Sequence, residues 1–343
     1  MYTRHLGRTG IRVSPLCLGA MMLGSWGNPD HHDAVAIIHR ALDAGINFVD
    51  TADVYSAGES EVIVGEALAT VDRSRVVLAT KVHAPMSDDP NAQGNSRRWI
   101  LAECDHSLRR LGTDYIDLYQ VHRPDERTDI DETLGALTQL VQAGKIRSFG
   151  SSTFPAEQIV EAQWVAERRG RERFMTEQPP YSLLVRGIER DVLPTAQSYG
   201  MGVIPWSPLA GGWLSGRFGQ GKDNTSHRSA RLPDRYDLGL AVNQRKLEIV
   251  TELGALAAEA GLSLIELSLA FVLEHPAVSS AIIGPRTMEQ LESQLSAPDV
   301  HLEPDLLDRI DAIVAPGTNV NPEDAGWQPA ALTDPRLRRR SRR

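Results

Sequence analysis

The chain has 343 residues, of which 41% are hydrophobic and 24% charged, and its formal net charge is -9 at pH 7. These values are typical of a globular protein with a sizeable core, and the acidic balance argues against a nucleic-acid partner. No apolar run approaches the ~18 residues of a membrane span, and the first ten residues lack the apolar segment of a secretory signal. We therefore expect a cytoplasmic protein that binds neither membranes nor nucleic acids.

Eight short apolar segments recur along the chain, and longer segments of helical periodicity follow them. This alternation indicates βαβ units, and eight of them favour a closed (β/α)8 barrel, often called a TIM barrel, of the α/β class. The alternative is an open doubly wound sheet, but its GxGxxG turn after an early strand is absent. The expected strands are residues 14–21, 48–50, 76–81, 116–122, 146–152, 176–181, 202–207 and 280–285.

Three segments depart from the repeat. Residues 4–14 predict an N-terminal β-hairpin at the bottom of the barrel. Residues 210–240, after the seventh strand, are long and rich in Gly, Pro and Arg, which predicts a mobile loop that orders over a bound cofactor. We expect residues 1–315 to form a single barrel domain, with 316–343 a C-terminal extension that ends in an Arg-rich tail.

Polar side chains end three consecutive expected strands. Asp50 ends the second strand, Tyr55 follows it, Lys81 ends the third and His122 ends the fourth. Because the carboxyl ends of barrel strands meet at one face, these side chains are expected to converge. A phenol is a weak acid at neutral pH unless a neighbouring cation stabilises its phenolate. Lys81 can supply that charge, with Asp50 holding the ammonium and a neutral His122 orienting a carbonyl, which suits protonation of an alkoxide as hydride arrives from a cofactor.

The sequence resembles the aldo-keto reductase family of NAD(P)H-dependent barrel oxidoreductases, close to the group that includes potassium-channel β-subunits. The resemblance covers nearly the whole chain, and the joint order of the motifs is very specific. The motifs are LGRTGIRVSPLCLGAM, GINFVDTADVYSAGESE, LATK, SLRRLGTDYIDLYQVHRPD, GKIRSFGSSTF, EQPPYSLL, PWSPLAGG and IIGPRTMEQLESQL.

This resemblance implies a catalytic tetrad of Asp50, Tyr55, Lys81 and His122, with Tyr55 as the general acid. The family's steroid double-bond reductases carry Glu in place of His122, so the chain resembles the carbonyl reducers. The implied reaction is NADPH-dependent reduction of an aldehyde or ketone to the alcohol. The identity of this small-molecule substrate, and the oligomeric state, stay open.

The resemblance also implies a binding site for NADPH. Arg286 and Thr287 take the positions expected for its 2′-phosphate, and a guanidinium suits phosphate geometry. Ser152 and Gln294 stand where the family usually has Asn. Trp206 is implied to stack on the nicotinamide, and Ser151, Ser152 and Gln178 to bind its carboxamide. The full implied set is Gly19, Ala20, Met21, Asp50, Ser151, Ser152, Gln178, Trp206, Ser207, Pro208, Leu209, Gly211, Gly284, Arg286, Thr287, Gln290 and Gln294.

Two further expectations concern ligands. Loops after the first, third, fourth and seventh strands are expected to line a substrate pocket through Trp26, Met86, Arg123 and Trp213. The two cysteines, Cys17 and Cys104, lie far apart without zinc-site spacing, so we expect buried thiols and no metal.

Two rival functions use the same residues. A strand-end lysine such as Lys81 can attack a carbonyl, as in a Schiff-base lyase, although Asp50 would keep the amine charged. A nucleotide-sensing regulatory subunit with slow turnover is the other alternative, because the family includes ion-channel β-subunits. Borohydride trapping would distinguish a lyase from the carbonyl reductase. A turnover assay would distinguish a regulatory subunit from the carbonyl reductase.

Overall fold

The core of the molecule is a closed parallel barrel. The computed structural model describes residues 1–218 and 232–338, so residues 219–231 of the expected long loop and 339–343 of the tail lie outside the described residues. Eight parallel strands pair in the order β10-β3-β4-β5-β6-β7-β8-β9. They are β3 (Leu16–Gly19), β4 (Phe48–Asp50), β5 (Val77–Val82), β6 (Ile116–Val121), β7 (Ile146–Ser152), β8 (Thr176–Gln178), β9 (Gly202–Val203) and β10 (Ala281–Ile283).

Hydrogen bonds between the segments of β9 and β10 close this sheet. The Ser279 N–H donates to Val203 O at 2.8 Å, and the Ile282 N–H donates to Pro205 O at 2.9 Å. All eight expected strands are present, and the expected (β/α)8 barrel is confirmed. The carboxyl ends of the strands therefore meet at one face, which we call the mouth.

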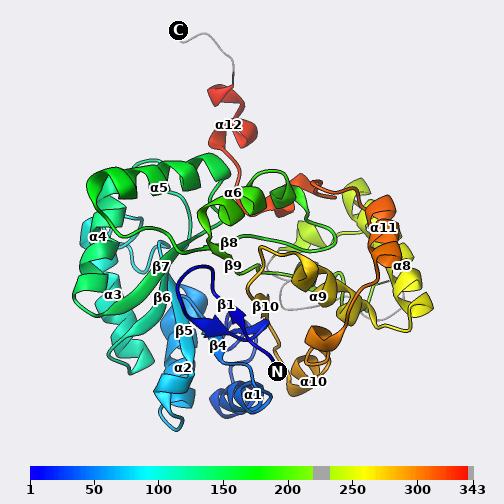
Figure 1. The fold of residues 1–343 in the computed structure, drawn as a ribbon, viewed down its shortest axis with the longest axis horizontal. Helices are drawn as coiled ribbons and strands as arrows, with labels where there is room; N and C mark the ends of the chain where they lie inside the picture. The colour runs from blue at the N-terminus through cyan, green and yellow to red at the C-terminus, as the bar shows by residue number, and fades with distance from the viewer. Residues whose placement is uncertain (219–231, 339–343) are drawn as a thin grey trace.

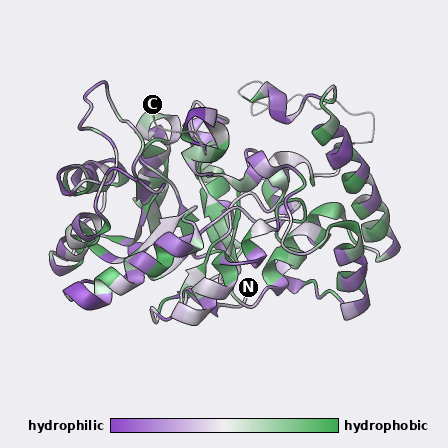
Figure 2. Ribbon diagram, turned by 90° about the horizontal axis from the view of Figure 1, so that it is seen from above, coloured by the Kyte–Doolittle hydropathy of each residue, from purple (hydrophilic) through white to green (hydrophobic). Residues whose placement is uncertain are grey.

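Helices surround the strands (Figure 1). Figure 2 shows apolar strands at the centre and polar residues on many outward helix faces, as expected for amphipathic helices around a barrel. The helices are α1 (His31–Asp43), α2 (Glu59–Leu68), α3 (Arg97–Leu111), α4 (Ile130–Gln142), α5 (Ala156–Arg169), α6 (Val192–Tyr199), α8 (Ala241–Glu259), α9 (Leu264–Glu274), α10 (Met288–Glu292), α11 (Pro304–Ile313) and α12 (Ala330–Thr333).

Local sequence sets the ends of these helices. The Ser96 side chain caps α3 by accepting a hydrogen bond from Trp99 N–H, and Gly112 ends this helix with φ 61°. Ser263 and Glu266 form a reciprocal capping box at the start of α9. Within the described residues no single helix is long and apolar enough to cross a membrane, and α8 with α9 meets those criteria only as a pair bent by 92°.

The predicted N-terminal hairpin covers the end of the barrel opposite the mouth. β1 (Arg4–His5) pairs with β2 (Arg12–Val13) in antiparallel register. The Arg8 N–H donates to Gly200 O, just before β9, and the Gly7 N–H donates to the Ser279 hydroxyl, just before β10. Leu6 and Val13 are fully buried among the inward-facing apolar side chains, which include Phe48, Leu118 and Ile204. The hairpin thus closes the amino ends of the strands.

The segments beyond the barrel repeat lie near the mouth. Trp213, which precedes the undescribed residues, stacks on Phe218 with ring centroids 4.0 Å apart. The C-terminal extension runs back along the β8–α6 connection, where the Val320 N–H donates to Leu184 O at 3.0 Å. Beyond this contact α12 projects away from the barrel (Figure 1).

Gly150 in β7 packs tightly against β8, whereas Gly254 in α8 has open space around it. A methyl group at Gly150 would meet Thr176 Oγ1 at 1.9 Å and Thr176 O at 2.7 Å, whereas one at Gly254 in α8 would meet nothing within 4 Å. We expect Gly150→Ala to lower the free energy of unfolding by more than ~2 kcal/mol, because the backbone oxygen cannot rotate away.

The matched variant Gly254→Ala is expected to raise the free energy of unfolding by about 0.5–1 kcal/mol, since alanine favours a helix interior. Urea unfolding followed by circular dichroism measures both changes. Equal stability of the two variants would contradict the close packing of β7 on β8.

Candidate active site

Four polar side chains converge at the mouth, from three neighbouring strands. Asp50 ends β4, Lys81 lies in β5 and His122 directly follows β6. Tyr55 begins the 3-10 turn Tyr55–Gly58 after β4. Lys81 Nζ lies 2.5 Å from Asp50 Oδ2 and 3.3 Å from Tyr55 Oη, so the ammonium donates to both side chains. The structure thus brings the four expected residues together.

The ion pair between Lys81 and Asp50 is buried. The Lys81 side chain is 0% exposed and that of Asp50 4% exposed. Burial by itself lowers the pKa of Lys81, but the charge of Asp50, the phenol of Tyr55 and the hydrogen bonds to both raise that pKa overall. Lys81 is therefore a fixed cation beside the phenol oxygen.

Two glutamines hold the other oxygen of Asp50. Gln120 Nε2 donates to Asp50 Oδ1 at 3.0 Å, and Gln178 Nε2 donates to the same oxygen at 2.9 Å. With Lys81 on Oδ2, the carboxylate is hydrogen-bonded on both oxygens, which fixes its orientation. Gln178 was expected near a cofactor, and it lies against this carboxylate.

His122 provides an uncharged ring beside Tyr55. The ring centroids are 5.7 Å apart with an interplanar angle of 81°. Burial, reinforced by the positive charges of Lys81 and Arg123, holds the pKa of His122 well below its usual range. The imidazole is therefore neutral at physiological pH and can donate a hydrogen bond without carrying charge.

Backbone strain gathers at the mouth. In the described part of the chain, five non-glycine residues have φ in the left-handed region, and all follow β4, β7 or β9. Each such conformation costs on the order of 1–3 kcal/mol, and the conformation is least favourable for a β-branched residue. These residues are Ser56 (51°), Ala57 (56°), Thr153 (60°), Ser207 (56°) and Ala210 (49°).

The alternation of β7 and β8 places Ser151 and Ser152 on opposite faces of the sheet. Ser151 pairs with Glu177, and Ser152 pairs with Gln178, so each pair shares one face of the sheet. Gln178 points into the barrel toward Asp50, which places Ser151 on the outer face. Both hydroxyl groups donate within the sheet, that of Ser151 to Glu177 Oε2 at 2.5 Å and that of Ser152 to Gln178 O at 2.9 Å. Ser152 is the serine on the inner face.

The segment before α10 has the features of an anion-binding end. A methyl group at Gly284 would meet nothing within 4 Å, so the backbone there borders open space. The Arg286 N–H donates to Gln290 Oε1 at 2.8 Å, which fixes the turn. Across residues 1–218 and 232–338 the guanidinium of Arg286 forms no ion pair. Thr287 caps α10, and Gln294 is buried with its amide on Gln290 O.

The remaining residues expected around the cofactor lie at the ends of β3 and β9. Gly19 ends β3, and Ala20 N–H donates to Asp50 O at 2.8 Å. After β9, Trp206 N–H donates to Pro179 O, and its buried indole N–H has no partner among the described residues. The other members lie on the same two segments, namely Met21, Ser207, Pro208, Leu209 and Gly211.

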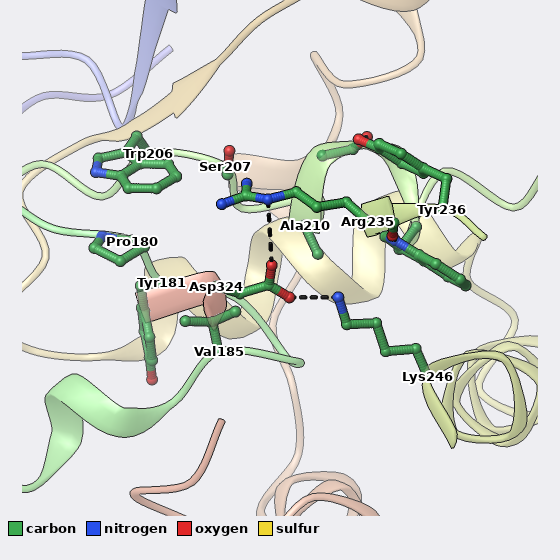
Figure 3. Close-up of a pocket in the computed structure, with 12 residues that line it drawn as sticks. Pro180, Tyr181, Val185, Trp206, Ser207, Ala210, Arg235, Tyr236, Lys246 and Asp324 are labelled. Carbon is green, nitrogen blue, oxygen red and sulfur yellow. Dashed lines mark hydrogen bonds and ion pairs between the residues drawn. The ribbon is translucent and has the colours of Figure 1, made fainter. Parts of the chain in front are cut away.

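A pocket lies beside Trp206 (Figure 3). Lys246 Nζ of α8 lies 2.5 Å from Asp324 Oδ2, which comes from the C-terminal extension, and Arg235 Nε lies 4.0 Å from Asp324 Oδ1. Lys246 is only 1% exposed, whereas the side chain of Asp324 is 16% exposed, so the lysine of this second ion pair is buried and its partner is partly exposed. Aromatic side chains complete the lining, namely Tyr181, Trp206, Trp213 and Tyr236.

The four expected substrate-pocket residues have different positions. Trp26 borders Tyr55 with ring centroids 6.0 Å apart, and Trp213 lines the pocket beside Trp206. Arg123 follows His122 and donates to the Thr153 hydroxyl at 3.2 Å. Met86 packs against the main apolar core, and its backbone bonds to Ala92 O, so no described contact brings it to the tetrad.

Sequence analysis missed several residues at this site. Gln120 had a readable signal, because it precedes His122 by two positions and shares its face of the strand. Thr153 had no signal in its residue type. Lys246 and Asp324 meet only through the fold, since 77 residues separate them in sequence. Among the described residues no group of three or more His, Cys, Asp or Glu side chains is arranged to hold a metal ion.

The mouth of this parallel barrel thus holds a buried lysine and aspartate beside a half-buried tyrosine. The sequence model of the aldo/keto reductase family matches residues 15–315 of this chain. The "Uncharacterized oxidoreductase YrpG" of Bacillus subtilis (strain 168) is 41% identical, over 94% of this chain and 99% of that protein. The chain therefore belongs to the aldo/keto reductase family.

Two other relatives are named as a channel subunit and as a reductase. The "Probable voltage-gated potassium channel subunit beta" of Oryza sativa subsp. japonica is 37% identical, over 92% of this chain and 97% of that protein. The "Versiconal hemiacetal acetate reductase" of Aspergillus parasiticus is 34% identical, over 88% of this chain and 93% of that protein.

Glu177 on the outer face of β8 generates a prediction about stability. Burial raises the pKa of its carboxyl to about 7, although hydrogen bonds from Ser151 and Phe154 oppose the shift. The carboxyl of an unfolded chain ionises near pH ~4.3, so between these values the folded protein retains a proton that the unfolded chain has lost. Stability is therefore lost as pH rises through this window.

We expect the free energy of unfolding of the wild type to fall by roughly 3 kcal/mol more than that of Glu177→Gln between about pH 4.5 and 8. Urea titrations at both pH values measure this difference. The exposed Glu157→Gln serves as the control and should follow the wild type. Parallel curves for wild type and Glu177→Gln would show that Glu177 ionises normally in the folded protein.

Proposed function

We propose that this protein is an NADPH-dependent carbonyl reductase, in which Tyr55 is the general acid that protonates the oxygen of an aldehyde or ketone. The observation that carries this proposal is the position of Lys81 Nζ, which bonds both Asp50 Oδ2 and Tyr55 Oη. The names of the Bacillus and Aspergillus relatives support the reaction class.

Each member of the tetrad has a separate role. Tyr55 Oη donates its proton to the carbonyl oxygen as negative charge develops there. Lys81 stabilises the phenolate that remains, and Asp50 keeps Lys81 charged and in place. The neutral ring of His122 orients the carbonyl by hydrogen bonding and does not compete for the proton. Bound NADPH would supply the hydride.

The fit to NADPH rests on donor chemistry at the two ends of the mouth. Arg286 offers an unpaired guanidinium for the 2′-phosphate, with Thr287, Gln290 and Gln294 around it. Gly284 leaves room for the close approach of a phosphate to the backbone. At the other end, Gln178 and Ser152 on the inner face would bind the carboxamide, and Trp206 would pack against the nicotinamide.

Two alternatives use the same barrel. A Schiff-base lyase needs a neutral Lys81 amine, but Asp50 raises the pKa of this lysine and opposes that role. The second alternative is a nucleotide-sensing subunit with slow turnover, which the names of the potassium-channel β-subunit relatives favour. NADPH oxidation against a panel of aldehydes, ketones, sugars and quinones discriminates this subunit from the reductase.

Tyr55→Phe tests the general acid, because it retains the ring and removes only the hydroxyl. We expect turnover to fall by ~10²-fold or more, the range typical of a lost proton-transfer group, with NADPH affinity nearly unchanged. Lys81→Met should give a similar loss, and Asp50→Asn a loss in the same direction. Steady-state NADPH oxidation and fluorescence titration of the cofactor measure the two quantities. Reduction of a good aldehyde at near wild-type rate by Tyr55→Phe would show that Tyr55 is only a packing residue.

Arg286→Ala tests the cofactor preference. A charge-assisted contact to phosphate contributes ~1.5–3 kcal/mol, so the wild type should bind NADPH at least roughly tenfold more tightly than NADH. The variant should lose this preference through weaker binding of NADPH alone. Quenching of tryptophan fluorescence reports both dissociation constants. Equal dissociation constants for the two nucleotides in the wild type would contradict the proposal that Arg286 binds the 2′-phosphate.

A further inference from the structure

Arg123 places a positive charge at the mouth without an acidic partner. Its Nη1 donates to His122 O at 2.6 Å and to Thr153 Oγ1 at 3.2 Å. No Asp or Glu of the described residues forms an ion pair with it, and the other guanidinium nitrogens have no hydrogen-bond partner there. A guanidinium has five N–H donors, so most of its binding capacity is unused.

The position of this guanidinium relates it to the proposed chemistry. Arg123 directly follows His122, whose ring centroid lies 5.7 Å from that of Tyr55. Its acceptor Thr153 also borders the indole of Trp206, because a methyl group at Gly326 would lie 2.8 Å from Trp206 Cζ2 and 3.1 Å from Thr153 Cγ2. Arg123 therefore directly follows a residue proposed to orient the carbonyl, and it bonds to a neighbour of the ring proposed to pack on the nicotinamide.

Burial makes this charge costly. Burial lowers the pKa of Arg123, while electrostatic interactions with Tyr55 and Glu177 oppose the shift. Glu177 does not neutralise the guanidinium, because its carboxyl is bound by the Ser151 hydroxyl and the Phe154 N–H and its own pKa is raised to about 7. The guanidinium of an arginine stays protonated near neutral pH. An anionic group of a ligand would therefore supply the ion-pair partner that this guanidinium lacks among the described residues.

Other cations near the mouth show the contrast. Lys81 is paired with Asp50, and Lys246 is paired with Asp324 at 2.5 Å, as Figure 3 shows for the second pair. Arg286 also lacks an ion pair, and the proposed function assigns it to the 2′-phosphate of the cofactor. Among the described residues Arg123 is thus a second guanidinium without an ion pair at the mouth, directly after His122, which is proposed to orient the carbonyl.

We propose that Arg123 binds an anionic group of the substrate, so that the protein prefers aldehydes or ketones that carry a carboxylate a few bonds from the carbonyl. This inference rests on the proposed carbonyl reduction. With the carbonyl oxygen at Tyr55 and His122, a guanidinium on the next residue can form a forked pair with the carboxylate. This contact forms in the bound substrate and persists in the transition state, so its loss should raise KM more than it lowers kcat.

The test compares 4-carboxybenzaldehyde with methyl 4-formylbenzoate, a neutral ester of similar shape, at saturating NADPH. For the wild type we expect kcat/KM to be higher for the acid. In Arg123→Met the acid-to-ester ratio of kcat/KM should fall about 10- to 100-fold, the effect of losing one charge-assisted pair. Arg123→Lys should lie between the two proteins, because it retains the charge without the fork.

Arg127→Met is the matched control, because Arg127 lies in the same loop with its side chain 83% exposed and 3.5 Å from Asp125. Its acid-to-ester ratio should equal that of the wild type. An unchanged ratio in Arg123→Met would overturn the assignment of Arg123. If the wild type reduces neither aldehyde, the panel of carbonyl compounds above decides the reaction, and fluorescence titration with 4-carboxybenzaldehyde decides the subsite. Weaker binding to Arg123→Met than to wild type would support the subsite, and equal binding would overturn it.

Discussion

The buried ion pair between Lys81 and Asp50 is the interaction on which the mouth depends. Removing one partner of such a pair typically costs about 3–5 kcal/mol, because the other charge is left without compensation in the interior. Here the pair is also supported by Gln120 and Gln178, whose amides bind the second oxygen of Asp50. The parallel sheet makes this possible, since four strands contribute polar side chains to one point inside an apolar barrel. The atoms of this ion pair therefore contribute both to the stability of the mouth and to its proposed chemistry.

The fold was readable from the sequence because its signals are local. Each strand is a short apolar run, several helices begin at a side-chain cap, and the repeat occurs eight times, so an error in one element would not have changed the architecture. The convergence of Asp50, Tyr55, Lys81 and His122 followed from the same logic, since a residue at the end of a barrel strand has only one face to occupy.

The rest of the site depends on relations that a linear sequence does not contain. Ser151 and Ser152 are adjacent and identical in type, and only the register of β7 on β8 shows which one faces inward. The left-handed backbone of Thr153 runs against the preference of a β-branched residue, so local propensity predicts the wrong conformation. Lys246 and Asp324 have no shared motif, because their contact is produced by the path of the C-terminal extension.

That extension has a consequence for how the protein is made. Gly326 lies against Trp206, and Asp324 pairs with Lys246, so residues 321–326 form part of the wall beside the mouth. They are synthesised after all eight strands, and domains generally begin to fold from the N-terminal side during synthesis. The strands and the tetrad are therefore synthesised before the segment that completes this wall. The pocket beside Trp206 can therefore take its final form only after the whole barrel has been synthesised.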